Sequence, residues 1–223
     1  MKTKTVSALW ICLLAALCSS LMALVDGLWQ PQYLIKSAVK ACLFLLVPLL
    51  LARPFQLKLG NAFRPGKWVL ITGLCLGTAT FCILLGAYSL LGPYLDLSAV
   101  PAALAQNGGI NKDNFLFVSL YIAFCNSILE EFFFRNFVFL GLLEQHRKLL
   151  AFLFSAGAFA VYHAGMLITM IPFGLFLLTL FALFGCGLLF NALNYRSKRI
   201  WASWFVHIGA NLAINLIGMQ LLK

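Results

Sequence analysis

Long apolar runs, each about the length that crosses a bilayer, limit what this sequence can fold into. They cover approximately residues 6–25, 33–52, 68–91, 114–143, 149–165, 168–191 and 200–218. A helix needs about 20 consecutive apolar residues to span the hydrocarbon core. Backbone groups in lipid must be hydrogen-bonded within the segment, and a barrel strand would alternate apolar with polar residues, so these continuous runs predict helices. We therefore expect an all-α fold, a polytopic transmembrane helical bundle with about seven spans.

Composition supports this prediction and narrows the class of partner. The chain is 63% hydrophobic and only 10% charged, whereas soluble domains are about one quarter charged. Its net charge of +10 does not indicate nucleic-acid binding, because the basic residues lie mostly in short loops between apolar runs. The first run resembles a signal peptide, but further spans follow, and we expect it to remain as a helix. The expected partner is the lipid bilayer, with no nucleic acid.

The basic residues also predict an orientation. Most fall in loops on one side of the predicted bundle, and Lys36 and Lys40, near the start of the second span, are exceptions. Loops rich in Lys and Arg stay in the cytoplasm, which predicts a cytoplasmic amino terminus in a bacterial or archaeal plasma membrane. The residues on that side are Lys2, Lys4, Arg53, Lys58, Arg64, Lys67, Arg147, Lys148, Arg196, Lys198 and Arg199.

Cysteines are scattered through the apolar runs, and no Cys-x-x-Cys occurs among the seven. This pattern predicts small buried hydrophobic residues rather than a metal site or a disulfide framework.

Two adjacent carboxylates, Glu130 and Glu131, stand inside the fourth run, in the stretch NSILEEFFFRN. A carboxylate at the centre of a bilayer costs about 2.5–3.5 kcal/mol on insertion scales. Arg135 follows Glu131 by four residues and can pair with it on one helix face. Glu130 is rotated by about 100° from Glu131, so we expect it to point elsewhere, unpaired and desolvated. A desolvated carboxylate suits a general base, whereas a purely structural ion pair would explain Glu131 and Arg135 only.

Two further polar groups lie in later spans, as FAVYH ending at His163 and HIGAN from His207 to Asn211. At about 1.5 Å rise per residue, Glu130 lies about 20 Å and His163 about 21 Å from the cytoplasmic ends of their spans. By the same rise, His207 lies about 10 Å and Asn211 about 17 Å deep. Helices that tilt in the ordinary way can bring these four side chains together.

A carboxylate, two imidazoles and a carboxamide at similar depth can activate water. Glu130 could take a proton from water, a histidine could pass one to a leaving amine, and Asn211 with His207 could stabilise an oxyanion. Alternatively, Glu130, His163 and His207 could hold zinc, with water as the fourth ligand. The His-Glu-x-x-His motif of common zinc helices is absent, and we expect no cofactor.

The three motifs resemble those of the CPBP intramembrane proteases, the CAAX-protease and bacteriocin-processing family, also called Rce1-like or Abi. They are Glu-Glu-x-x-x-Arg at 130–135, Phe-x-x-x-His at 159–163 and His-x-x-x-Asn at 207–211. The resemblance covers the last four spans. It implies a glutamate-dependent intramembrane endopeptidase with catalytic Glu130, His163, His207 and Asn211, and with supporting Glu131, Arg135 and Phe159.

From this resemblance we expect two parts, three amino-terminal spans in 1–113 and a four-span catalytic core in 114–223. The implied substrate is a membrane-associated peptide or protein, either prenylated at a CAAX sequence or of the bacteriocin or leader type. Two alternatives stay open. A proton-coupled transporter would also bury Glu and His, and a non-enzymatic immunity or partner protein would keep the fold without needing Glu130.

Overall fold

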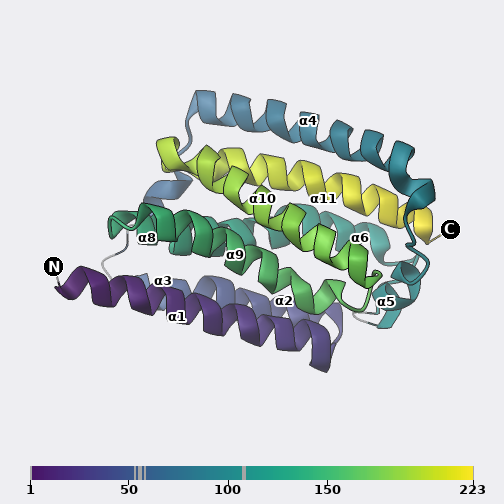
Figure 1. Ribbon diagram of the computed structural model, residues 1–223, viewed down its shortest axis with the longest axis horizontal. Helices are drawn as coiled ribbons and strands as arrows, with labels where there is room; N and C mark the ends of the chain where they lie inside the picture. The colour runs from purple at the N-terminus through teal and green to yellow at the C-terminus, as the bar shows by residue number, and fades with distance from the viewer. Residues whose placement is uncertain (1, 53, 55–56, 58, 107–108, 223) are drawn as a thin grey trace.

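Helices account for the whole bundle in the computed structural model, which describes residues 2–52, 54, 57, 59–106 and 109–222 and has no strand among them (Figure 1). Seven helical spans in this part of the chain are long and apolar enough to cross a membrane. The all-α polytopic bundle predicted from the apolar runs is therefore confirmed. The spans are Ala8–Trp29, Tyr33–Ala52, Lys67–Tyr94, Phe115–Glu144, Lys148–Leu167, Phe173–Ser197 and Trp201–Leu221.

Several spans are built from more than one helical type. Four of them are almost entirely α-helical, namely α4 (Lys67–Leu91), α9 (Lys148–Leu167), α10 (Phe173–Ser197) and α11 (Trp201–Leu221). The first span joins α1 (Lys2–Leu24) to the π-helix η1 (Val25–Trp29), and the second joins α2 (Tyr33–Ala41), the π-helix η2 (Cys42–Leu46) and α3 (Val47–Ala52). The fourth contains α6 (Phe115–Tyr121), π-helix η5 (Ile122–Asn126), α7 (Ser127–Glu130), π-helix η6 (Glu131–Leu140) and α8 (Gly141–Glu144).

The span boundaries agree with the sequence prediction to within about four residues except at the sixth span, which ends at Ser197 rather than near residue 191. That span begins at Phe173, five residues later than predicted, because Pro172 lacks a backbone N–H and stands as the N-cap of α10. The helix ends where Lys198 adopts φ of 54° and donates its N–H to the Asn194 carbonyl at 2.9 Å. The two long loops contain the short helices η3 (Leu59–Phe63) and α5 (Val100–Gln106), and the third span ends in the short helix η4 (Gly92–Tyr94). Arg53 and Lys58, used above for orientation, lie outside the described residues.

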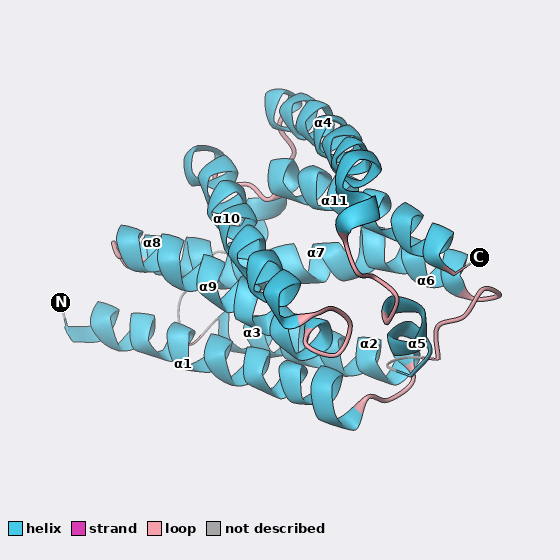
Figure 2. Cartoon of the chain, turned by 45° about the vertical axis from the view of Figure 1, so that its right-hand side comes forward, coloured by secondary structure: helices cyan, strands magenta, loops and turns pink. Residues whose placement is uncertain are grey.

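Small residues bring α4 and α11 into close contact at the edge of the bundle (Figure 2). A Cβ on Gly73 would lie 2.9 Å from Cα of Ala202, and one on Gly209 would collide with the Gly77 carbonyl. Backbones can approach this closely only where side chains are missing. Elsewhere α9 packs against both α1 and α10, and the amino and carboxyl ends lie at opposite ends of the bundle (Figure 1).

Phenylalanines from η6 fill the centre of the bundle. Every residue of η6 is buried, and Phe133 stacks on Phe44 of η2 with ring centroids 4.2 Å apart. Phe134 makes an edge contact with Phe159 of α9 at 5.5 Å. Such offset and edge-on pairs fix the spacing of neighbouring helices. The run FFFRNFVF thus joins the second, fourth and fifth spans around the two carboxylates.

The prediction that the cysteines are buried is wrong for most of them. Only Cys18 is buried, Cys12 is half-buried, and the remaining ones are exposed on the outer faces of the helices, at Cys42, Cys75, Cys82, Cys125 and Cys186. Lipid tails solvate a thiol about as well as a protein interior does, so hydrophobicity alone does not place a cysteine inside a membrane protein.

Candidate active site

Glu130 lies at the last position of α7, where the fourth span changes from α- to π-helix. Its side chain is buried, and its two oxygens have different surroundings. Oε1 accepts hydrogen bonds from Lys40 Nζ at 3.0 Å, from Asn126 Nδ2 at 2.8 Å and from the Tyr162 hydroxyl at 3.2 Å. Oε2 accepts none from the described residues. The carboxylate is therefore held by one oxygen and free to react at the other.

Both predicted histidines face the free oxygen of Glu130. His163 Nε2, on α9, lies 3.8 Å from Oε2, and His207 Nε2, on α11, lies 3.6 Å from it. The three separate spans thus bring Glu130, His163 and His207 together within the protein interior, as their similar depths predicted.

In each imidazole ring, the hydrogen bond made by Nδ1 determines whether Nε2 can donate or accept a hydrogen bond. His163 Nδ1 lies 2.7 Å from the Phe159 carbonyl oxygen, and His207 Nδ1 lies 3.1 Å from Glu131 Oε1. Carbonyl and carboxylate oxygens only accept, so both Nδ1 atoms carry the hydrogen. In the neutral rings, Nε2 is then a lone-pair acceptor. Each Nε2 lies within 4 Å of Glu130 Oε2, and a hydrogen-bond donor such as water can bridge the carboxylate and a neutral ring.

Glu131 holds His207 rather than forming only the predicted pair with Arg135. Its Oε2 accepts a hydrogen bond from the Ser203 hydroxyl at 2.5 Å, and Arg135 Nε stands 3.7 Å away. That ion pair is long, and no guanidinium nitrogen of Arg135 has a hydrogen-bond partner among the described residues. Instead the guanidinium lies 4.4 Å from the ring centroid of Phe159 and 5.0 Å from that of Phe190, where aromatic faces stabilise a cation.

Asn211 is not hydrogen-bonded to Glu130 or to either histidine in the part of the chain that the structure describes. Its Nδ2 donates to the Ile122 carbonyl of η5 at 3.2 Å, and Asn215 likewise donates to the Ser119 carbonyl at 2.9 Å. Both amides tie α11 to the fourth span near its π-helical segment. The role of Asn211 as a hydrogen-bond donor to the oxyanion remains a prediction.

The expectation that Glu130 is unpaired is wrong, because Lys40 forms a salt bridge with it at 3.0 Å. Lys40 and Lys36 stand out in the sequence as exceptions to the loop pattern, and an ionisable residue inside a span is itself a functional signal. Asn126 precedes Glu130 by four residues and could have been found by helical spacing. Tyr162 is adjacent to His163. Ser203 carried no recognisable signal in the sequence.

The metal alternative remains a prediction. Among the described residues, no group of three or more His, Cys, Asp or Glu side chains is arranged to hold a metal ion. Two neutral imidazoles and a carboxylate are suitable donors for zinc. However, the Lys40 ammonium already occupies the other oxygen of the same carboxylate and would repel a divalent cation.

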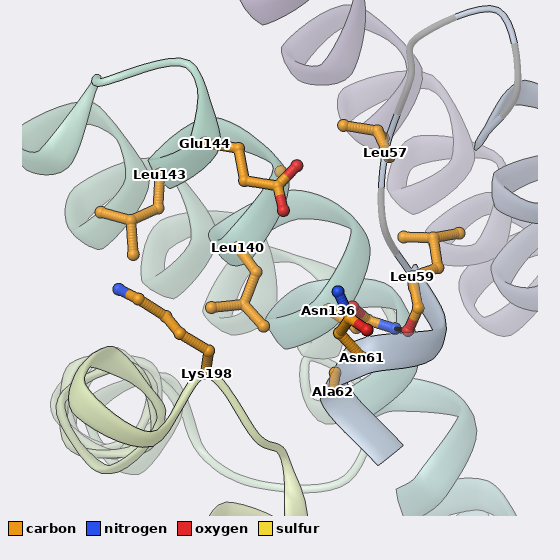
Figure 3. Close-up of a pocket in the computed structure, with 10 residues that line it drawn as sticks. Leu57, Leu59, Asn61, Ala62, Asn136, Leu140, Leu143, Glu144 and Lys198 are labelled. Atoms are coloured by element: carbon orange, nitrogen blue, oxygen red, sulfur yellow. Dashed lines mark hydrogen bonds between the residues drawn. The ribbon is translucent and has the colours of Figure 1, made fainter. Parts of the chain in front are cut away.

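A cavity of about 360 Å³ lies away from these residues, at the end of the bundle where the fourth and sixth spans finish (Figure 3). Its walls come from α8, η3 and the residue after α10, and Asn136 donates to the Leu59 carbonyl at 2.8 Å within it. Lys198 and Glu144 also line it, and none of the predicted catalytic residues does. This cavity is therefore separate from the candidate active site.

Comparison with known proteins gives one family match. Residues 112–213 match the family described as type II CAAX prenyl endopeptidase Rce1-like. The matched segment contains all three sequence motifs and ends two residues after Asn211. Searches of curated proteins and of solved structures gave no significant match.

Proposed function

Since residues 112–213 of this chain match the Rce1-like family, we propose that it is an intramembrane endopeptidase that hydrolyses a peptide bond of a membrane-associated substrate. The observation that carries the proposal is the meeting of Glu130 Oε2 with two imidazole Nε2 atoms at 3.6 and 3.8 Å. The family description favours a peptide that ends in a prenylated CAAX sequence. A bacteriocin or leader-type peptide is the alternative substrate.

The reaction needs only the residues already described. A water molecule between Glu130 Oε2 and His163 Nε2 gives one proton to Glu130 Oε2 as its oxygen attacks the peptide carbonyl carbon. The carbon–nitrogen bond then breaks, and the proton passes to the leaving amine directly or through His163. The second proton of the water, left on the new carboxyl group, also passes to the amine, so the products are a carboxylate and an ammonium group, with water as the only co-reactant.

His207 and Asn211 are the proposed binding site for the oxyanion. His207 can donate from Nε2 only in its protonated form, because its Nδ1–H is directed at Glu131. A carboxylate on the far side of an imidazole supports that form, as the third member of a catalytic triad does. Glu131 would therefore orient His207 rather than react itself.

The test uses purified protein in detergent and an internally quenched peptide ending in a farnesylated Cys-aliphatic-aliphatic-X sequence. Glu130→Gln should lower kcat by at least about 10²-fold, the effect of losing a general base. Glu144 is a carboxylate at the exposed end of the same span, and the Glu144→Gln variant should cleave the peptide at the wild-type rate. Cleavage that survives Glu130→Gln unchanged would remove Glu130 from the mechanism.

Two further measurements separate the alternatives. Zinc content of the active protein, and activity after chelation, decide whether a metal takes part. A comparison of membrane peptides from cells with wild-type protein and with Glu130→Gln identifies the natural substrate. Proton-driven flux in liposomes without cleavage would favour a transporter, and protection or partner binding that persists without Glu130 and His163 would favour an immunity protein.

A further inference from the structure

Lys40 lies outside the segment that matches the family, on α2 in the second span. Its side chain is buried, with 9% of its surface exposed. A lysine inside a span is expensive unless its charge is compensated. Its position therefore calls for a partner.

The ammonium of Lys40 has two hydrogen-bond partners, both on the fourth span. It donates to Glu130 Oε1 at 3.0 Å and to Asn126 Oδ1 at 2.5 Å. It also lies 4.9 Å from the ring centroid of Tyr162, whose hydroxyl donates to the same Glu130 oxygen. Lys40 thus contacts every other group that binds Oε1.

These contacts form a closed ring that fixes the carboxylate. Because the ammonium can only donate, Asn126 must turn Oδ1 toward Lys40, which leaves Nδ2 to donate to Glu130 at 2.8 Å. Three donors on Oε1 leave Oε2 as the only oxygen able to accept a proton from water. The same contacts determine that this oxygen faces His163 and His207.

We propose that Lys40 is a positioning residue of this active site, supplied by an amino-terminal helix, that holds Glu130 by one oxygen and presents the other to the reacting water. The expected effect of Lys40 on the rate rests on the proposed function. The ion pair between Lys40 and Glu130 rests only on the contacts in the structure. Other charged or titratable groups around Glu130 are Glu131, Arg135, Tyr162, His163 and His207. None of them replaces the contact from α2.

The rate experiment compares three variants with the farnesylated, quenched peptide. Lys40→Met keeps the length of the side chain but loses the contact, and kcat should fall by about 10–100-fold with little change in KM, since misplacing a reacting group by about 1 Å costs about 10²-fold. Lys40→Arg retains a donor and should recover most of the rate. Lys36→Met is the matched control, because Lys36 lies one turn earlier on the same helix, is also buried, and pairs with Asp26 at 2.9 Å. It should leave kcat per folded molecule unchanged.

A stability cycle tests the ion pair without any substrate. Lys40→Met and Glu130→Gln should each lower the unfolding temperature in detergent, because each leaves one buried charged group without its partner. The double variant should unfold at a higher temperature than either single variant.

The outcomes distinguish the two proposals. Additive losses in the cycle, or a Lys40→Met enzyme with the wild-type kcat, would overturn the role of Lys40. A loss of rate that Lys36→Met shares in full would do the same, since any buried lysine would then suffice. If the cycle shows coupling but the wild-type protein cleaves none of the peptides, the ion pair stands and the proposed function fails.

Discussion

At the scale of single residues, two neighbouring carboxylates perform separate tasks because a helix turns between them. Glu130 is bound by Lys40, Asn126 and Tyr162 through one oxygen, whereas Glu131 contacts His207 and Ser203. The rotation of about 100° per residue predicted that they would point to different partners. It could not identify those partners, which lie on other spans.

The contact between Glu131 and His207 gives a first prediction. Glu131→Gln removes the negative charge that supports the protonated form of His207 and no longer fixes the hydrogen on Nδ1, so Nε2 would lose its proposed role as a donor to the oxyanion. We expect kcat to fall by about 10²-fold or more, by analogy with the loss of tautomer control in a triad. Ser203→Ala removes only one hydrogen bond to Glu131 and should lower kcat less than about tenfold. Equal losses in the two variants, measured on the monodisperse fraction, would contradict this role.

The guanidinium of Arg135 gives a second prediction, on stability. It is fully buried against Phe159 and Phe190, and a planar, weakly hydrated cation suits that position better than an ammonium. Arg135→Lys should destabilise the protein by about 2 kcal/mol, the size of a desolvated cation–π contact. Arg196→Lys on an exposed position should change stability by less than about 0.5 kcal/mol. Unfolding in detergent monitored by circular dichroism measures both, and matching values would refute the aromatic contribution.

At the scale of helices, the π-helical segments decide which residues face the centre. The segment η6 begins at Glu131 and carries its phenylalanines into the core, and η5 lies beside it in the same span. Side chains from other helices bind carbonyls in this region, as Ser155 does at Phe134 with 2.8 Å and Asn211 at Ile122 with 3.2 Å. Such bonds satisfy backbone groups that π-helical turns leave exposed.

The close packing of α4 on α11 gives a third prediction. Gly209→Ala would place a methyl group on the Gly77 carbonyl, and the two backbones would have to separate. We expect a loss of about 1–3 kcal/mol, typical of overpacking, and a lower kcat because His207 lies two residues away on α11. Gly86→Ala on α4 meets nothing within 4 Å and should be tolerated. Equal unfolding temperatures for the two variants would show that this contact is not tight.

At the scale of the whole molecule, the second span is part of the candidate site. Lys40 comes from the part predicted as 1–113, and the other site residues come from 114–223. The division into these two parts remains a prediction. Contacts between α4 and α11 also cross it, so we expect that the segment 114–223 alone would lack both Lys40 and the helix that supports α11.

Orientation in the membrane gives a fourth prediction. The excess of basic residues near the ends of the fourth and sixth spans predicts that those ends lie in the cytoplasm. In a background without native cysteines, Ser98→Cys should react with a membrane-impermeant maleimide in intact cells, and Glu144→Cys only after permeabilisation. Both positions are exposed. The reverse labelling pattern would show that the predicted orientation is wrong.

Much of the architecture could be predicted from the sequence because it depends on local requirements. Each apolar run must satisfy its own backbone hydrogen bonds in lipid, and the thickness of the bilayer sets its length. The rise per residue placed Glu130 and His163 at similar depth, and His207 about 10 Å closer to the cytoplasmic end of its span. The sixth span begins at Phe173, later than predicted, because of a local feature, Pro172. The mostly apolar residues 168–172 had favoured an earlier start.

The sequence by itself therefore determined the seven spans, the helical class and the motif residues that meet in the structure. Only the tertiary structure decided that Lys40 binds Glu130, that Glu131 orients His207 and that Arg135 rests on aromatic rings. The physical reason is that these contacts join helices far apart in the chain. Many weak side-chain contacts, summed over whole helix faces, select which faces meet, and no single stretch of sequence records that choice.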